Sequence, residues 1–93
     1  MSFIKEPGKN LGSIKIFTLS TCIWCKKTKN LLKSLEVEFE YADMDLLSAE
    51  EKQERLDEIK RWNPACSYPT LVINERECIV GYDEAHIRKI LGL

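Results

Sequence analysis

The sequence predicts an α/β fold in which a mixed β-sheet carries helices on both of its faces. Apolar residues recur at strand spacing and at helix spacing in the order β-α-β-α-β-β-α. The opening β-α-β unit predicts two parallel strands joined by a right-handed crossover, whereas the last two strands are close enough to form a hairpin. The chain of 93 residues has room for one domain. We expect residues 1–13 to be a tail or lead-in and residues 14–93 to form the domain.

The first half of the domain contains two predicted strands and a helix. Residues 14–19 (IKIFTL) are rich in β-branched and aromatic side chains, which favours a strand. Apolar side chains then recur at helical spacing over residues 23–35, behind the hydroxyls of Ser20 and Thr21, which are typical of a helix start. Residues 37–41 (VEFEY) alternate between apolar and charged side chains and therefore predict a second strand.

The second half is predicted to contain two helices and a β-hairpin. Ser48 followed three residues later by Glu51 is a capping-box pattern, so we expect a helix that ends before Pro64. Asp83 can cap a last helix, which Gly92 closes. The hairpin strands between these two helices are residues 70–73 and 78–80.

The composition argues against several classes of protein. The formal net charge is −1, from 14 basic and 15 acidic residues, whereas a nucleic-acid-binding protein should show a basic excess. The longest uninterrupted apolar run has four residues, too few to span a membrane. The N-terminus has neither the apolar core nor the cleavage site of a signal peptide, so we expect a cytoplasmic protein in a reducing environment.

Two of the four cysteines, Cys22 and Cys25, form a C-x-x-C motif at the junction of the first strand and the first helix. In a cytoplasmic chain this motif beside a strand–helix unit is typical of a redox-active dithiol. Cys22 would lie at the helix N-terminus, where free N–H groups, the helix dipole and the nearby Lys26 and Lys27 favour the thiolate. Cys25 would lie one turn further along, where it can attack a mixed disulfide formed on Cys22.

The cysteines also allow other interpretations. A structural zinc site would need Cys66 and Cys78 as further ligands, but these residues are twelve positions apart rather than closely paired. Two buried apolar cysteines are common in proteins, yet burial does not explain why both members of the motif lie at a helix start. Cys66 is either an accessory thiol near the dithiol or an incidental loop residue, and we expect Cys78 to be buried packing.

Three landmarks together resemble the glutaredoxin family of the thioredoxin superfamily. They are residues 18–25 with the C-x-x-C motif, the Tyr68-Pro69 pair directly before a strand, and residues 81–84 before the last helix. The resemblance covers about residues 14–93, which is the predicted domain. It implies the thioredoxin fold, a four-stranded mixed sheet flanked by three helices, and the activity of a thiol–disulfide oxidoreductase that passes electrons to disulfides.

The resemblance also implies roles for particular residues. Cys22 would be the nucleophile and Cys25 the resolving thiol. Pro69 would be a cis proline beside the dithiol, and the backbone of Tyr68 would pair with a bound peptide or thiol. Further substrate contacts would come from Trp24 and from the segment where glutaredoxins hold the amine and α-carboxylate of glutathione, which is Gly81, Tyr82 and Asp83.

The sequence departs from the usual glutaredoxin pattern around the site. Leu19 stands where a lysine commonly pairs with a glutathione carboxylate, Ile23 and Trp24 replace the usual proline and tyrosine, and Val80 replaces a glycine.

The implied electron donor is either glutathione or a flavoprotein or ferredoxin-linked reductase. The implied substrates are protein disulfides or mixed disulfides of a small thiol. The exchange requires no cofactor, with glutathione as a possible co-substrate, and we expect a monomer.

Ile23 also leaves a second class of function open. Glutaredoxins whose first cysteine is not followed by proline can hold an iron–sulfur cluster at a dimer interface, with that cysteine and glutathione as ligands. The alternative expectation is therefore an iron–sulfur cluster or metal-binding protein, with Cys22 as a ligand. A brown dimer on anaerobic reconstitution would favour the cluster, and a colourless monomer that reduces a disulfide would favour the oxidoreductase.

Overall fold

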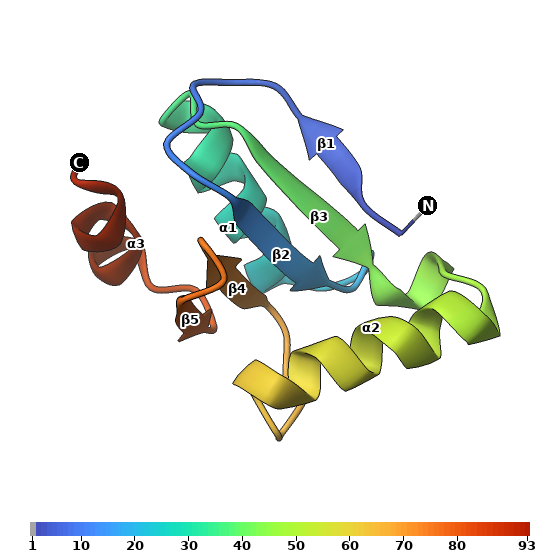
Figure 1. Cartoon of the computed structure of the whole chain (residues 1–93). Coiled ribbons are helices and arrows are strands. Elements are labelled where there is room, and N and C mark those ends of the chain that lie inside the picture. The colour runs from blue at the N-terminus through green and yellow to red at the C-terminus, as the bar shows by residue number, and fades with distance from the viewer. Residues whose placement is uncertain (1) are drawn as a thin grey trace.

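One mixed β-sheet forms the centre of the molecule, which the computed structural model describes for residues 2–93 (Figure 1). Its strands are β1 (Ile4–Glu6), β2 (Ile14–Thr18), β3 (Phe39–Asp43), β4 (Thr70–Ile73) and β5 (Glu77–Val80). The helices are α1 (Ile23–Ser34), the short 3₁₀ helix η1 (Met44–Leu46), α2 (Ala49–Trp62) and α3 (Glu84–Leu91). Across the sheet the strands follow the order β1-β3-β2-β4-β5.

The pairing of the central strands confirms the predicted mixed sheet. β2 runs parallel to β3, to which α1 connects it, and antiparallel to β4. β4 and β5 form the predicted antiparallel hairpin. Ile16 in the centre of the sheet pairs with Tyr41 on one side and with Leu71 on the other. Because parallel strands share a direction, the carboxyl ends of β2 and β3 lie at the same edge of the sheet, where α1 begins (Figure 1).

Within residues 2–93 the sheet has one strand more than the predicted four, and this strand lies in the segment expected to be a tail or lead-in. β1 pairs antiparallel with β3 over three residues. Phe3 helps to hold it, because its ring packs edge-to-face on the buried ring of Phe17 with 5.7 Å between centroids. Three residues are too few for an alternating pattern to be recognised in the sequence.

Backbone hydrogen bonds with residues 36–38 hold the segment that follows β1. The N–H of Lys9 donates to the carbonyl of Glu36 (2.7 Å), and the carbonyl of Lys9 accepts from the N–H of Glu38 (2.8 Å). A Cβ on Gly8 would lie only 2.6 Å from backbone atoms of Val37 and Glu38. A side chain at this position would therefore push the two segments apart.

The variant Gly8→Ala is expected to lower the free energy of unfolding by about 1–3 kcal/mol, the usual cost of forcing extra volume into a packed site. Urea denaturation measures this loss. Hydrogen exchange should also become faster at the amides of Lys9 and Glu38, while the amides of the central strand β4 stay protected. Unchanged exchange at Lys9 would show that the two backbones tolerate the added methyl group.

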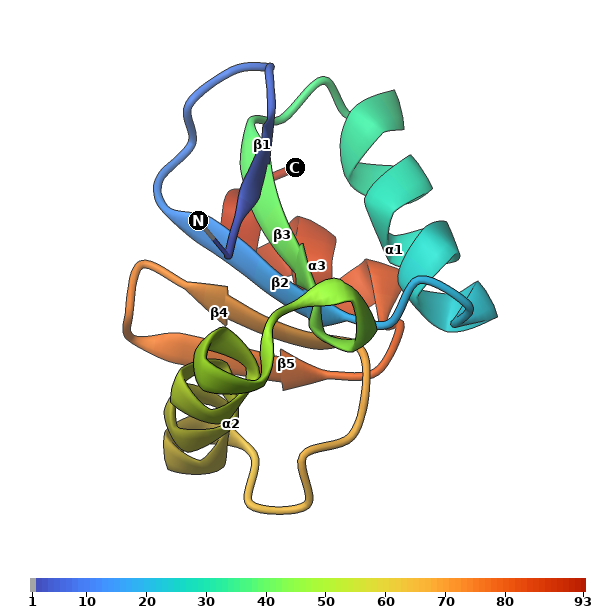
Figure 2. The ribbon, with the colours of Figure 1, turned by 90° about the vertical axis from the view of Figure 1, so that its right-hand side faces the viewer.

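Hydrophobic cores lie on both faces of the sheet, so the prediction of helices on both faces is confirmed (Figure 2). α1 and α3 cover one face, where Leu32 and Ile87 belong to the same core as Ile16. α2 covers the other face, where Ile59 belongs to the same core as Phe17. The neighbours Ile16 and Phe17 point to opposite faces, as successive residues of a strand do.

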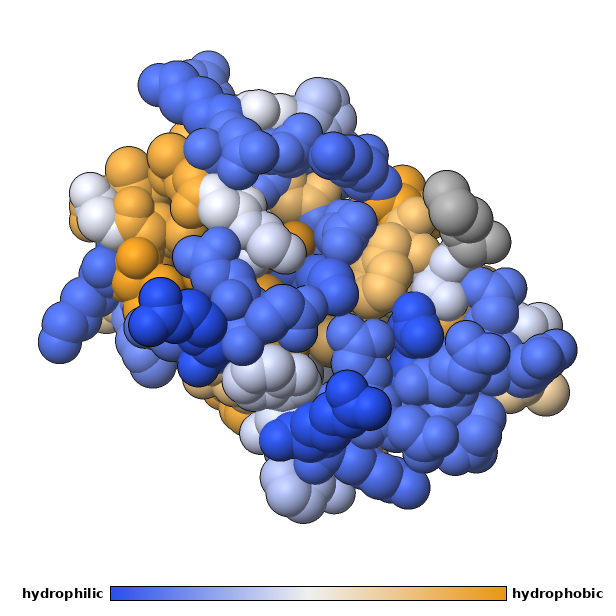
Figure 3. Space-filling view, viewed as in Figure 1, coloured by the Kyte–Doolittle hydropathy of each residue, from blue (hydrophilic) through white to orange (hydrophobic). Residues whose placement is uncertain are grey.

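α2 begins where the capping-box pattern predicts. Ser48 is its N-cap, and the Ser48 hydroxyl accepts a hydrogen bond from the backbone N–H of Glu51 (3.2 Å). The helix ends at Trp62, before Pro64. Most of its remaining surface is charged, and the space-filling view is almost entirely hydrophilic over α2, at its lower right (Figure 3). No helix within residues 2–93 has both the length and the apolar character needed to cross a membrane.

Candidate active site

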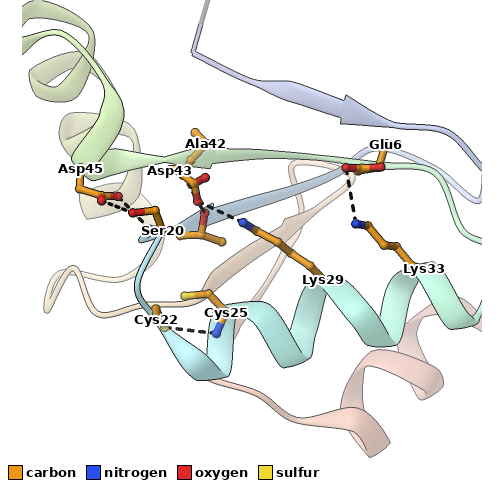
Figure 4. A network of polar contacts seen from close by, with 10 residues as sticks. Glu6, Ser20, Cys22, Cys25, Lys29, Lys33, Ala42, Asp43 and Asp45 are labelled. Carbon is orange, nitrogen blue, oxygen red and sulfur yellow. Dashed lines mark hydrogen bonds and ion pairs between the residues drawn. The ribbon is translucent and has the colours of Figure 1, made fainter.

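Cys22 is the N-cap of α1 and lies just beyond the carboxyl end of β2 (Figure 4). Its backbone N–H donates to the carbonyl of Leu19 (3.1 Å), which turns the chain into the helix. Its sulfur accepts a hydrogen bond from the backbone N–H of Cys25, with 3.2 Å between Sγ and N. The first turn of α1 contains no acidic residue. The free N–H groups and the positive end of the helix dipole therefore face this half-buried sulfur.

Cys25, one turn into α1, is completely buried. Burial is the largest cause that raises the pKa of its thiol to about 12, and a hydrogen bond with Cys22 and the negative charge of Cys22 raise it further. A backbone hydrogen bond at Leu19 and the positive charge of Lys29 oppose this increase. At neutral pH Cys25 therefore holds its proton, and Cys22 is the thiol that can meet a substrate first.

Asp45 of η1 fixes the loop that leads to Cys22. Its carboxylate accepts a hydrogen bond from the backbone N–H of Ser20 (2.8 Å) and another from the Ser20 hydroxyl (Figure 4). These hydrogen bonds, with that of the hydroxyl as the larger cause, lower the pKa of Asp45. Sequence reasoning assigned Ser20 to a helix start and missed this contact, which joins residues 25 positions apart. The available signal was the acidic residue two positions after the end of β3.

One cavity of about 290 Å³ gathers most of the predicted substrate-binding residues beside the dithiol. Trp24 is exposed at its rim and stacks on Tyr82, with ring centroids 6.1 Å apart and planes inclined by 26°. The ammonium of Lys27 lies 4.5 Å from the centroid of the Trp24 ring, a cation–π contact. The cavity is lined by Trp24, Tyr68, Pro69, Gly81 and Tyr82.

The loop before β4 has the backbone that the resemblance implies. The peptide bond between Tyr68 and Pro69 is cis. The carbonyl of Pro69 accepts a hydrogen bond from the N–H of Gly81 (2.8 Å), which ties this loop to the segment before α3. Gly81 has a φ of 86°, a conformation that glycine adopts without strain. The two loops thus form one wall of the cavity.

Asp83 lies next to this cavity in the chain but does not line it. It is the N-cap of α3, and its carboxylate accepts a hydrogen bond from the backbone N–H of His86 (3.1 Å). Its side chain remains half exposed, so a bound ligand can still reach it. The predicted helix start at Asp83 is confirmed.

The other two cysteines lie in different surroundings. Cys66 is half-buried in the loop before β4, where it packs against the core beneath α2. Burial raises the pKa of Tyr68, and the charges of Cys66 and Cys25 add to this, so Tyr68 lies near both thiols. Cys78 is half-buried on β5, and burial raises its pKa. Across residues 2–93 there is no group of three or more cysteine, histidine or acidic side chains arranged to hold a metal ion.

A dithiol at the start of a helix that packs on a mixed sheet defines the class of redox proteins with a thioredoxin-like fold. The family model for glutaredoxin matches residues 14–78, well over half of the chain. The chain therefore belongs to the glutaredoxin family, and it is a glutaredoxin-like redox protein.

Individual relatives agree with this assignment. The chain is 36% identical over 78 residues to an uncharacterized glutaredoxin-like 8.6 kDa protein in the rubredoxin operon of Clostridium pasteurianum, covering 84% of this chain and 96% of that protein. The glutaredoxin from Methanosarcina mazei Go1 is 42% identical, with a TM-score of 0.92 over 100% of this chain and 90% of that chain. Methanoredoxin from Methanosarcina acetivorans is 48% identical, with a TM-score of 0.90 over 92% of this chain and 90% of that chain. These likenesses confirm the predicted thioredoxin-like fold.

Proposed function

We propose that the protein is a thiol–disulfide oxidoreductase that reduces protein disulfides or mixed disulfides through Cys22 and Cys25. The observation that carries the proposal is the asymmetry of the two thiols. Cys22 is half-buried at the N-terminus of a helix, whereas Cys25 is fully buried behind it. Burial as the largest cause holds the pKa of Cys25 at about 12. One thiol is thus placed to attack a substrate, and the other waits in its protonated form.

The exchange proceeds in two steps that together transfer two electrons. The Cys22 thiolate attacks one sulfur of the substrate disulfide, the substrate S–S bond breaks, and the released thiolate takes up a proton. Cys25 then loses its proton to solvent or to the departing thiolate and attacks Cys22 Sγ. The bond between Cys22 and the substrate breaks, and the second substrate thiol leaves. The protein is left with a Cys22–Cys25 disulfide, which an electron donor must reduce.

Apolar side chains around Cys22 support protein disulfides as the preferred substrates. Ile23 and Trp24 are exposed on the first turn of α1, and Leu46 is exposed on η1 beside the contact that fixes the Cys22 loop. Leu19, where glutaredoxins commonly carry a lysine, packs against the core beneath α2. A glutathione carboxylate would find no cation at Leu19, whereas peptide side chains flanking a disulfide would find apolar contacts. We propose a dedicated flavoprotein or ferredoxin-linked reductase as the donor, with glutathione as the alternative.

Two substrates tested with wild type and Cys25→Ser distinguish these possibilities. Wild type is expected to reduce insulin disulfides, and Cys25→Ser to lose at least about 100-fold of this rate because it cannot resolve the mixed disulfide. Cys78→Ser on β5 is the control and should keep the rate. Turnover of a glutathione mixed disulfide by Cys25→Ser would show that glutathione is accepted and can act as donor. Activity with neither substrate would overturn the proposal and favour the iron–sulfur or metal-binding alternative.

A further inference from the structure

A largely buried ion pair joins α1 to β3, about one helical turn beyond Cys25. The ammonium of Lys29 lies 3.1 Å from Oδ1 of Asp43, the last residue of β3, and their side chains are only 15% and 11% exposed. The next lysine on the same side of α1, Lys33, pairs with Glu6 at 3.7 Å and is 54% exposed (Figure 4). Both pairs join a lysine to a carboxylate, but only the Lys29–Asp43 pair is shielded from solvent. A charge that is shielded from solvent acts over a longer range than an exposed one.

Several contacts fix the ammonium of Lys29 in one place. The hydroxyl of Thr18 donates to the same Oδ1 of Asp43 (2.6 Å), and it also lies 3.1 Å from the carbonyl of Ala42. The Lys29 ammonium also lies 3.9 Å from the centroid of the Tyr41 ring. Desolvating two charges is costly, and such a pair contributes little to stability compared with apolar residues of the same size. Stability alone therefore does not account for the Lys29–Asp43 ion pair.

Lys29 stands four residues after Cys25, so the two side chains lie on the same face of α1. Side chains on a helix lean toward its N-terminus, and Figure 4 shows that of Lys29 reaching back along α1 on the side of Cys25. Its positive charge is one of the influences that lower the pKa of Cys25. Lys29 thus places a shielded cation near a buried thiol that has to become a thiolate.

We propose that Lys29, fixed by Asp43 and Thr18, is a positioning residue for the second step of the exchange, in which its ammonium stabilises the thiolate of Cys25 as that sulfur attacks the mixed disulfide. This inference rests on the proposed function. In this role the charge of Lys29 acts on Cys25 while Cys25 resolves the mixed disulfide, and Lys29 needs no contact with the substrate.

The mixed disulfide is the state in which this charge matters most. In the reduced protein, burial, the hydrogen bond with Cys22 and the charge of Cys22 all raise the pKa of Cys25. Once Cys22 is bonded to a substrate sulfur, it carries no charge and its two contributions disappear. The opposing influences of the Leu19 hydrogen bond and of Lys29 remain, and the groups that face Cys25 are then Tyr68 from the loop before β4 and the Lys29–Asp43 pair.

The size of the effect follows from how thiolates react. Loss of the cation raises the pKa of Cys25 and reduces its thiolate fraction at neutral pH. A more basic thiolate is also a better nucleophile, with a Brønsted coefficient of about 0.4–0.5, so part of the loss is offset. For each pH unit by which that pKa rises, the attack below the pKa therefore slows about 3- to 4-fold.

Single-turnover resolution tests the inference. Cys22 is converted to its mixed disulfide by reaction with the symmetrical disulfide 5,5′-dithiobis(2-nitrobenzoate), in a background with Cys66→Ser and Cys78→Ser. This reaction releases one coloured thiolate, and release of the second coloured thiolate by Cys25 is followed against pH. Lys29→Met and Lys29→Gln are expected to slow release about 3-fold or more at neutral pH and to move the pH profile upward. Lys29→Arg should restore both. Lys33→Met, the matched control on the same helix, should behave as wild type.

The outcomes separate the inference from the function on which it rests. Release that is unchanged in both Lys29→Met and Lys29→Gln, or slowed equally by Lys33→Met, would overturn the role of Lys29 while leaving the exchange intact. A slower rate without any upward shift of the pH profile would also overturn it, because a merely structural defect lowers the rate at every pH. Absence of release from wild type would overturn the proposed function together with the inference.

Discussion

Replacement of Cys22 by serine is expected to lower disulfide reduction at least about 1000-fold, to the uncatalysed background, because the proposed exchange needs a thiolate as its nucleophile and a serine hydroxyl stays protonated. The fold should not suffer. Serine is a preferred N-cap residue, and its hydroxyl can accept the hydrogen bond that the Cys22 sulfur accepts from the N–H of Cys25. Insulin reduction measures the activity, and thermal denaturation checks that the helix start is intact.

A matched substitution keeps this experiment specific. Cys66→Ser changes the same atoms in the loop before β4 and tests whether the third thiol takes part in the reaction. Full activity of Cys66→Ser would leave Cys66 as an incidental loop residue. Residual activity above about one hundredth in Cys22→Ser would contradict the assignment of the nucleophile, since no other group should replace a lost thiolate to that extent.

Removal of a core side chain beneath α1 is expected to have the largest effect on stability. Leu32 is 0% exposed and belongs to the core shared by α1, α3 and the sheet. Leu32→Ala should lower the free energy of unfolding by about 2–5 kcal/mol, through lost burial and the cavity left behind. Leu46→Ala makes the same chemical change at a side chain that is 69% exposed, and it should stay within about 0.5 kcal/mol of wild type. Urea denaturation of both variants gives the comparison, and similar losses would show that Leu32 does not support the core.

Much of the fold follows from local patterns that the sequence displays directly. The capping box at Ser48, the cap at Asp83 and the left-handed Gly92 with a φ of 74° mark helix ends as expected. β4 is recognisable because three of its four residues are apolar, and all four are buried. β1 escaped prediction because its three residues gain stability from pairing with β3 and from Phe3, not from their own pattern.

In the site, as in the fold, local features could be predicted from the sequence and contacts between distant segments could not. A motif and its distance from a helix start are local, so Cys22 and Cys25 could be identified from the sequence pattern. The Tyr68-Pro69 loop was identified through the resemblance to glutaredoxins. The contacts that tune the site join distant segments. Lys29 and Asp43 are 14 residues apart, and both residues are unremarkable alone in a chain with many charges. The register of β3 against β2 places Asp43 beside Thr18, and the packing of α1 on the sheet brings Lys29 to Asp43.

β1 also determines which strand forms one edge of the sheet and is exposed there to other molecules in solution. Without β1, the five residues of β3 would form the edge of the sheet and present unpaired N–H and C=O groups. A strand of a second molecule could pair with such an edge. With β1, the outer strand is three residues long and carries Lys5 and Glu6, whose charges disfavour such pairing. The N-terminal segment is thus expected to disfavour edge-to-edge aggregation of the protein at high concentration.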